Sequence, residues 1–350
     1  MIKDYIRKEL RDFKPYHTPF IPQKIKLDAN ESPFGLSGNV KEKLINWVKE
    51  RENLNFYPDT DSTELRRTIA SYWNLNMENI ILGVGSDQLI DCMMKVFLDP
   101  KDKVVMPTPS FSMYSQTTIL NHGIPIEVEL NEDYTYSWEN IIKACRRNNP
   151  KLLILCSPNN PTGNILSKVH IEEIAKNVDC PILVDEAYGE FADETGIELI
   201  NEYPNIVIFR TFSKAYGLAG LRVGYGIGSK EMIDAIYLTK PPYNLSTLSQ
   251  KIATWVLEDA KSYKKRISYL KNERDDLLEE LKKIPDIKVS PSDANFILIE
   301  TRDLNLDKKL EKRGIFVRSF KGNQNSLLLR ITVGYKEQNK MLIDALKSVL

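Results

Sequence analysis

Histidine and cysteine are scarce in this chain of 350 residues, which holds three histidines and four cysteines. The histidines lie far apart in the sequence and no two cysteines form a Cys-x-x-Cys pair, so we expect no metal site. Each cysteine instead stands alone in an apolar stretch. This arrangement favours reduced thiols in a protein core over disulfides, and a cytoplasmic location.

A long apolar run and a net charge are also absent. No stretch approaches the roughly 18 apolar residues of a membrane-spanning helix, and residues 1–9 are too charged for a signal peptide. Basic and acidic side chains number 48 each, so no overall field attracts nucleic acid or an anionic membrane. No helix-turn-helix pattern precedes the Pro-rich start, which disfavours a DNA-binding regulator. We expect a globular protein with neither a nucleic-acid nor a membrane partner.

Strands and helices alternate through the middle of the chain. Short apolar and β-branched runs predict seven strands, at residues 79–84, 103–107, 125–130, 151–156, 181–185, 205–210 and 221–227. Amphipathic stretches between several of them predict helices, at residues 87–97, 110–120, 137–147 and 167–177. This order is typical of an α/β fold with a mostly parallel sheet covered by helices on both faces.

The pattern changes after the Pro-Pro pair at residues 241–242. A long charged helix in two pieces is predicted over residues 248–283, followed by shorter elements at 296–300, 306–313, 315–318, 327–332 and 337–349. We therefore expect a large domain over residues 31–242 and a smaller α+β domain over residues 243–350. The Pro-rich residues 1–30 should form an extended N-terminal arm that packs on another surface.

Lys214 ends the segment FRTFSK at residues 209–214, directly after a predicted strand. An amine at this position can form a Schiff base with an aldehyde, while Thr211, Ser213 and Arg222 can hold a phosphate nearby. Pyridoxal 5′-phosphate would use both functions. A lysine in such a place is more often a solvated loop residue, so this segment by itself leaves both interpretations open.

Other predicted strands also end in polar or aromatic groups. Gly85, Ser86 and Asp87 open a helix, and the backbone N–H groups and dipole of a helix N-terminus favour an anion. Phe111 lies just past a strand, where its ring either stacks on a flat ligand or packs in the core.

The turn SPNNPTG at residues 157–163 presents the amide of Asn160 at a strand end. Asp185 ends a buried strand, where its carboxylate can pair with a protonated pyridine nitrogen or cap a helix. Tyr188 can donate a hydrogen bond to the oxygen of the same ring. Because the carboxyl ends of parallel strands share one edge of the sheet, we expect these groups to meet there.

Together these segments resemble fold-type I pyridoxal-phosphate-dependent aminotransferases, and among them the histidinol-phosphate aminotransferase family. The resemblance runs from LDANESPFG at residues 27–35 to LRITVG at residues 329–334, with SPNNPTG, DEAY and RTFSK between them in that order. It implies a large, mostly parallel seven-stranded sheet domain with a smaller α+β C-terminal domain, pyridoxal phosphate as cofactor, and a homodimer with shared active sites.

The resemblance also implies a role for each matching residue. Lys214, Asp185 and Tyr188 would be catalytic: Lys214 would carry the cofactor and move the Cα proton, Asp185 would pair with the ring nitrogen, and Tyr188 would bind the ring oxygen. The cofactor would also be held by Asn160, by Phe111 on the ring, by Gly85, Ser86, Asp87, Thr211, Ser213 and Arg222 at the phosphate, and by Tyr57 of a second subunit. Substrate would be bound by Arg330, Arg318, Tyr16, Asn30 and Asn160.

The resemblance implies ping-pong transfer of an amino group from glutamate to imidazole-acetol phosphate, giving 2-oxoglutarate and L-histidinol phosphate. Residues 17–20, His-Thr-Pro-Phe, lack the Pro-Gly pair that many members of the family carry there. Other substrates therefore stay open: a triose phosphate or similar small compound, an aromatic or general amino acid, or a phosphoamino acid in a related decarboxylase. A binding protein that kept the fold without the chemistry is disfavoured, because the full set of cofactor-binding side chains is present.

Overall fold

The computed structural model describes residues 2–11, 13, 25–50, 54–322 and 325–350, and two sheets organise them. The large sheet has seven strands, in the spatial order β2 (Ile80–Val84), β8 (Val223–Gly228), β7 (Ile206–Thr211), β6 (Ile182–Asp185), β5 (Leu152–Cys156), β3 (Lys103–Thr108) and β4 (Ile124–Glu129). Strand β8 is antiparallel to both of its neighbours and the remaining pairs are parallel. The prediction of a mostly parallel, seven-stranded sheet is confirmed, with strand ends that differ by about two residues at most.

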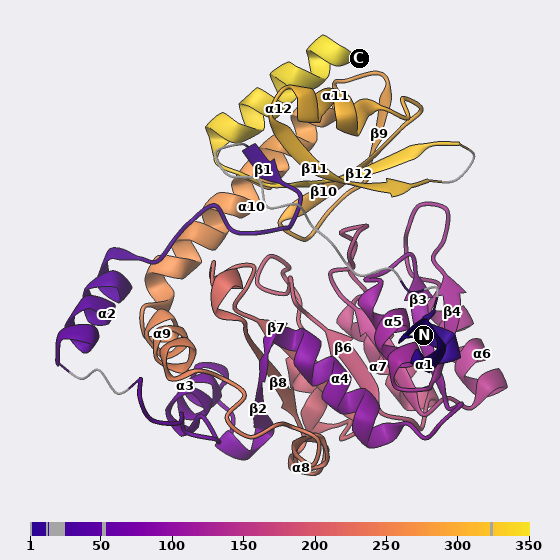
Figure 1. Cartoon of the computed structure of the whole chain (residues 1–350). Helices are drawn as coiled ribbons and strands as arrows, with labels where there is room; N and C mark the ends of the chain where they lie inside the picture. The colour runs from indigo at the N-terminus through magenta and orange to yellow at the C-terminus, as the bar shows by residue number, and fades with distance from the viewer. Residues whose placement is uncertain (1, 12, 14–24, 51–53, 323–324) are drawn as a thin grey trace.

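Helices cover both faces of the large sheet (Figure 1). One face packs against α4 (Gly85–Phe97), α5 (Met113–Leu120) and α8 (Lys230–Tyr237). The other face packs against α3 (Thr63–Trp73), α6 (Trp138–Asn148), α7 (Lys168–Asn177) and α9 (Thr247–Glu258). Central strands such as β5, Leu-Leu-Ile-Leu-Cys, are therefore buried along their whole length, as a parallel strand between two helical layers must be.

The smaller sheet has five strands, in the order β1 (Ile25–Leu27), β11 (Ile315–Lys321), β12 (Leu327–Thr332), β10 (Phe296–Thr301) and β9 (Ile287–Val289). The long helix α10 (Ala260–Lys282) leads from α9 to this sheet, where α11 (Leu306–Lys312) and α12 (Lys336–Val349) also lie (Figure 1). The predicted two-piece helix over residues 248–283 thus corresponds to α9 and α10. The division of the chain at residues 30 and 242 stays a prediction.

Several elements were not foreseen from the sequence. They are β1, β9, α3, α8 and a further helix, α2 (Gly38–Glu50), together with the 3₁₀ turns η2 (Met77–Asn79), η3 (Ile197–Asn201) and η4 (Ala219–Leu221). The expectation of an extended arm is wrong for its first residues, which form α1 (Ile2–Tyr5) and η1 (Lys8–Leu10). Arg7 anchors this segment by donating to the carbonyl groups of Ile119 and Leu120 at the end of α5. None of the described helices is both long and apolar enough to cross a bilayer.

Replacing Leu27 by alanine should lower the free energy of unfolding by about 2–5 kcal/mol, because this side chain is 1% exposed and its truncation leaves a cavity beside the small sheet. Urea unfolding followed by circular dichroism measures the change. Met341→Ala is the control, since Met341 is 55% exposed on α12 and its truncation should cost less than about 0.5 kcal/mol. A loss below about 1 kcal/mol for Leu27→Ala would show that β1 is only loosely held.

Candidate active site

A cavity opens at the carboxyl edge of the large sheet, where the loops after β2, β3, β5, β6 and β7 meet. Its lining consists of Gly85, Ser86, Asp87, Phe111, Tyr114, Cys156, Asn160, Asp185, Ala187, Tyr188, Thr211, Ser213, Lys214, Arg222 and Arg330. All but three of these residues were expected at the site from the sequence. The cavity therefore brings together groups that are widely spaced along the chain, as the strand-end argument predicted.

Lys214 projects its amine into this cavity from the turn after β7. The ammonium group donates a hydrogen bond of 2.9 Å to the carbonyl oxygen of Ala29 and lies 5.8 Å from the centre of the Tyr188 ring. Burial, together with the positive charge of Arg330, lowers the pKa of Lys214 to about 8. A substantial fraction of this amine is consequently unprotonated, and so nucleophilic, near neutral pH.

Asp185 lies at the end of β6 and is 3% exposed. The hydroxyl of Tyr114 donates to its carboxylate at 2.7 Å and the backbone N–H of Ala187 donates at 3.0 Å. Burial nevertheless raises the pKa of Asp185 to about 6, because the charged form has lost most of its water. A cationic partner in the cavity would therefore be bound strongly by this carboxylate. Sequence reasoning missed Tyr114, which reads simply as one residue of an amphipathic helix.

The opposite end of the cavity is built to receive an anion. Gly85, with φ of +71°, opens α4 and presents the helix N-terminus to the cavity. A Cβ atom on Gly224 would lie 2.3 Å from the backbone nitrogen of Ser86, so only glycine lets β8 approach this turn so closely. The hydroxyl groups of Thr211 and Ser213 stand 3.0 Å apart beside it.

Arg222 completes the anion-binding end. Its guanidinium lies 3.4 Å from the Ser213 hydroxyl and 3.0 Å from the carboxylate of Asp87, which is itself half exposed. A Cβ atom on Gly85 would come within 2.7 Å of this guanidinium, which is a second reason for glycine at that position. Two donors of different kinds, a helix terminus and an arginine, thus point at one small region.

Residues from the smaller sheet and the N-terminal part close the cavity from the other side. Asn30, fully buried at φ of +54°, donates to the Tyr188 hydroxyl at 2.9 Å. Arg330, on β12, donates to the Asn160 side-chain oxygen at 2.5 Å and to the Asp28 carbonyl at 2.6 Å. Burial raises the pKa of Tyr188 to about 12, so its hydroxyl keeps its proton and can act as a donor.

Four expected site residues do not line this cavity: Asn30, which reaches it only through its hydrogen bond to Tyr188, and three others. Tyr57 is 80% exposed and stacks on Tyr243, with 4.5 Å between the ring centres. Arg318 lies on β11 directly opposite Arg330 on β12, but it does not line the cavity. Tyr16 lies outside the described residues.

The groups in the cavity match the three reactive parts of pyridoxal phosphate. The Lys214 amine suits the aldehyde, the buried Asp185 carboxylate suits a protonated ring nitrogen, and the anion-binding end suits the phosphate. Phe111 contributes an aromatic ring to the lining between these ends. When bound, this cofactor supplies an electron sink for the negative charge that develops on a substrate carbon.

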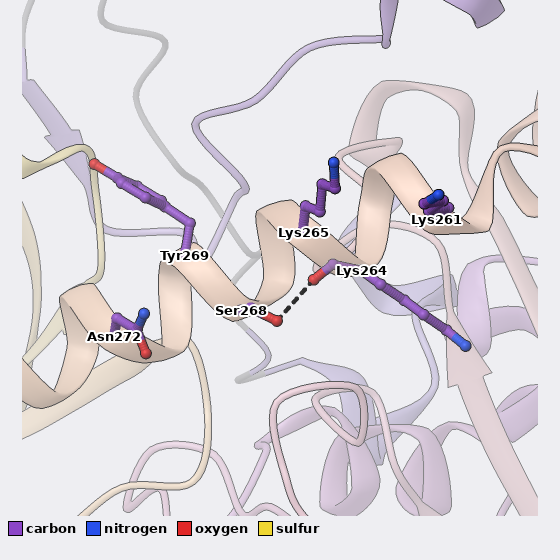
Figure 2. A pocket seen from close by; sticks show the side chains of 6 residues that line it. All are labelled: Lys261, Lys264, Lys265, Ser268, Tyr269 and Asn272. Atoms are coloured by element: carbon purple, nitrogen blue, oxygen red, sulfur yellow. Dashed lines mark hydrogen bonds between the residues drawn. The ribbon is translucent and has the colours of Figure 1, made fainter.

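A second hollow lies on the outer face of α10 and is lined by Lys261, Lys264, Lys265, Ser268, Tyr269 and Asn272. All six residues come from one helix, and the lysine side chains point in different directions (Figure 2). The only hydrogen bond drawn there runs from Ser268 to the backbone of Lys264, at 3.0 Å. Without converging groups from a second element, this surface is not a candidate active site.

Comparison with known proteins agrees with this geometry. The family model described as aminotransferase class I and II matches residues 22–346. The chain belongs to this aminotransferase family. A histidinol-phosphate aminotransferase of Ruminiclostridium cellulolyticum is 45% identical, over 100% of this chain and 99% of that protein. The enzyme described here is accordingly a pyridoxal-phosphate-dependent aminotransferase, acting on an amino donor and a carbonyl acceptor.

Two solved structures are similar to this aminotransferase over nearly their whole length. That of the histidinol-phosphate aminotransferase of Clostridium acetobutylicum has a TM-score of 0.85 and 26% identity, covering 93% of this chain and 98% of that one. That of the Sinorhizobium meliloti enzyme of the same name, in complex with pyridoxal phosphate, has a TM-score of 0.85 and 23% identity, covering 93% and 92%. The fold-type I architecture of this aminotransferase is thereby confirmed.

The rate at which the apoenzyme captures pyridoxal phosphate should rise with pH through a midpoint near 8. Below that pH most of Lys214 is protonated, so the rate should fall about tenfold per pH unit. The measurement is the initial rate of appearance of visible absorbance between pH 6 and pH 10. Lys214→Arg is the control and should develop no such band. A midpoint near 10.4, the value of a free lysine, would mean that the amine is fully solvated.

Proposed function

We propose that this aminotransferase transfers the amino group of glutamate to imidazole-acetol phosphate, yielding 2-oxoglutarate and L-histidinol phosphate. The observation that carries the proposal is the set of full-length relatives, 36–45% identical, that are named histidinol-phosphate aminotransferases. The reaction would contribute to histidine biosynthesis. Four cysteines without a disulfide support a cytoplasmic location.

The two arginines of the small sheet support an anionic substrate. Arg318 and Arg330 are direct cross-strand partners on β11 and β12, so their side chains leave the same face of the sheet. An anion bound between or beside two neighbouring guanidinium groups interacts favourably with both of them. A phosphate ester and a dicarboxylate are both anions that such a pair can bind, which suits a ping-pong enzyme with one site for two substrates.

In this proposal each cavity residue has a separate role. Lys214 carries the cofactor and moves the substrate Cα proton, for which a pKa of about 8 is well matched. Asp185 holds the ring nitrogen protonated, while Tyr188 and Asn160 bind the ring oxygen. Asn30 acts on the ring oxygen indirectly, by fixing the Tyr188 hydroxyl with its 2.9 Å hydrogen bond.

A second copy of the chain is proposed to complete the cofactor site with Tyr57. The segment around this tyrosine exposes an unusual amount of apolar surface: Leu54 is 55% exposed, Phe56 is 69% exposed and Tyr57 is 80% exposed. Ile45 and Val48, three residues apart on α2, are also at least half exposed. Contiguous exposed apolar side chains favour a protein–protein interface. The remaining divisions of the chain, an arm over 1–30 and domains over 31–242 and 243–350, belong to the same proposal.

Histidinol phosphate and glutamate should each bleach the visible absorbance of the holoenzyme in single-turnover experiments. The matched control is histidinol, which lacks only the phosphate and should react at least about tenfold more slowly, since a charged hydrogen bond contributes about 1.5–3 kcal/mol. A panel of other phosphorylated amines and aromatic amino acids completes the test. If glutamate reacts and histidinol phosphate does not, the proposed substrate is wrong. Carbon dioxide release from a phosphoamino acid, with no keto acid present, would instead indicate a decarboxylase.

Mixed dimers of Tyr57→Phe and Lys214→Ala chains should regain a cofactor site of native affinity. If Tyr57 of the partner subunit contacts the phosphate, the Tyr57→Phe chain supplies an intact Lys214 and its partner supplies an intact Tyr57. Retention of visible absorbance through gel filtration measures this recovery, with each homodimeric variant as a control. Mixed dimers that hold the cofactor no better than Tyr57→Phe alone would contradict a shared site.

A further inference from the structure

A buried triad of charged side chains lies behind the cofactor cavity, on the side of the large sheet that α3 covers. Arg210, on β7, donates to Glu186 through Nε at 3.0 Å and to Glu190 through Nη1 at 3.0 Å. The exposed fractions of these three side chains are 2%, 3% and 6%. The guanidinium also donates to the Thr195 hydroxyl at 3.0 Å, and the ring of Trp73 covers it at 4.9 Å. None of these groups takes part in the chemistry assigned to the cavity.

The loop after β6 is folded around this guanidinium. Glu186 accepts two further hydrogen bonds within the loop, from the Thr195 hydroxyl at 2.7 Å and from the Gly196 N–H at 2.6 Å. A Cβ atom on Gly189 would lie 2.8 Å from the Arg210 guanidinium carbon, so the loop has no room for a larger residue there. The triad is therefore a buried hydrogen-bonded network rather than an incidental ion pair, although one oxygen of Glu190 has no hydrogen-bond partner among the described residues.

Two members of the triad are sequence neighbours of residues at the two ends of the cofactor site. Glu186 follows Asp185, and Arg210 precedes Thr211. Successive side chains of an extended chain point to opposite faces, and accordingly Asp185 and Thr211 line the cavity while Glu186 and Arg210 do not. The Arg210 guanidinium lies instead against Trp73 of α3. The Glu186 N–H also donates to the Phe209 carbonyl at 2.8 Å, which continues the pairing of β6 with β7. One guanidinium thus ties together the two strand ends that carry the ring partner and the phosphate partner.

We propose that Arg210 is a positioning residue for cofactor binding, which fixes the spacing between Asp185 and the hydroxyl groups of Thr211 and Ser213. The carboxylate at one end of the cavity binds the ring and the hydroxyl groups at the other end bind the phosphate. When the two half-sites are correctly spaced, a ligand that carries both ring and phosphate binds far more tightly than either part alone, because the second contact is intramolecular. An error in the spacing removes that gain but leaves each half-site able to bind its own fragment. The inference concerns the cofactor and holds for any amino acceptor.

Arg210→Lys separates this role from general stability. Lysine keeps the charge, but its single ammonium lacks the planar fork that spans both carboxylates. The dissociation constant of the apoenzyme for pyridoxal phosphate should rise about tenfold or more, whereas those for pyridoxal alone and for inorganic phosphate alone should change less than about twofold. Absorbance titration measures the first two ligands and calorimetry measures phosphate.

Arg66→Lys is the matched control. Arg66 on α3 is half-buried, whereas Arg210 is fully buried, and it donates to backbone carbonyls of Met77 and Ile80 at the amino end of β2, away from the cavity. All three dissociation constants should stay near those of the native protein. If Arg210→Lys does not fold, Glu186→Gln keeps the shape of the side chain and serves instead. It should show the same selective loss of affinity for pyridoxal phosphate, to a smaller extent.

Two results would overturn the proposal. The first is an equal loss of affinity for pyridoxal phosphate, pyridoxal and inorganic phosphate, which is the signature of a general loss of structure. The second is unchanged affinity for pyridoxal phosphate in the folded variant. Neither measurement uses an amino donor or acceptor, so an incorrect assignment of histidinol phosphate would leave this test unaffected.

Discussion

The carboxylate of Asp185 loses nearly all of its water at the end of β6, and the rest of the site is arranged around the cost of that burial. Hydrogen bonds from Tyr114 and Ala187 offset part of the cost, yet the pKa still rises to about 6. The same withdrawal from water acts on the Lys214 amine in the opposite sense and lowers its pKa to about 8. One physical effect therefore prepares both groups: the acid gains from a cationic partner, and the amine is ready to react.

The large sheet could be predicted almost completely from the sequence, because strands buried on both faces are continuous apolar runs that end in loops with distinctive residues. The position of the site followed from the same regularity, since Asp185 ends such a run and Asn160 and Lys214 follow others within a few residues. Strands β1 and β9 could not be found in this way. Each is only three residues long, and what makes it a strand is a partner elsewhere in the chain rather than a local pattern.

The side-chain hydrogen bonds that support the site could not be predicted from the sequence for a related reason. Tyr114 looks like a core aromatic until the fold brings its hydroxyl to Asp185. Arg210 and Glu186 belong to the RTFSK and DEAY segments, yet the sequence suggested no role for either, although one guanidinium joins them behind the cavity. Asn30 was expected to bind substrate, and the sequence did not reveal that its side chain also hydrogen-bonds to Tyr188 and Thr332. Side-chain partners across strands depend on register, which composition and periodicity do not specify.

The parallel pairing of β1 with β11 has a consequence for synthesis of the chain on the ribosome. The large sheet is complete once Gly228 has emerged, whereas Ile25 must wait for Ile315 before it has a partner. The small sheet thus assembles from the first and the last parts of the polypeptide, after a long interval in which β1 has no strand to join. Domains generally fold as units during translation, and distant pairings form late because closing a long loop costs entropy. The nascent enzyme would acquire Lys214 and Asp185 early, but the Arg330 side of its cavity only when translation is nearly finished.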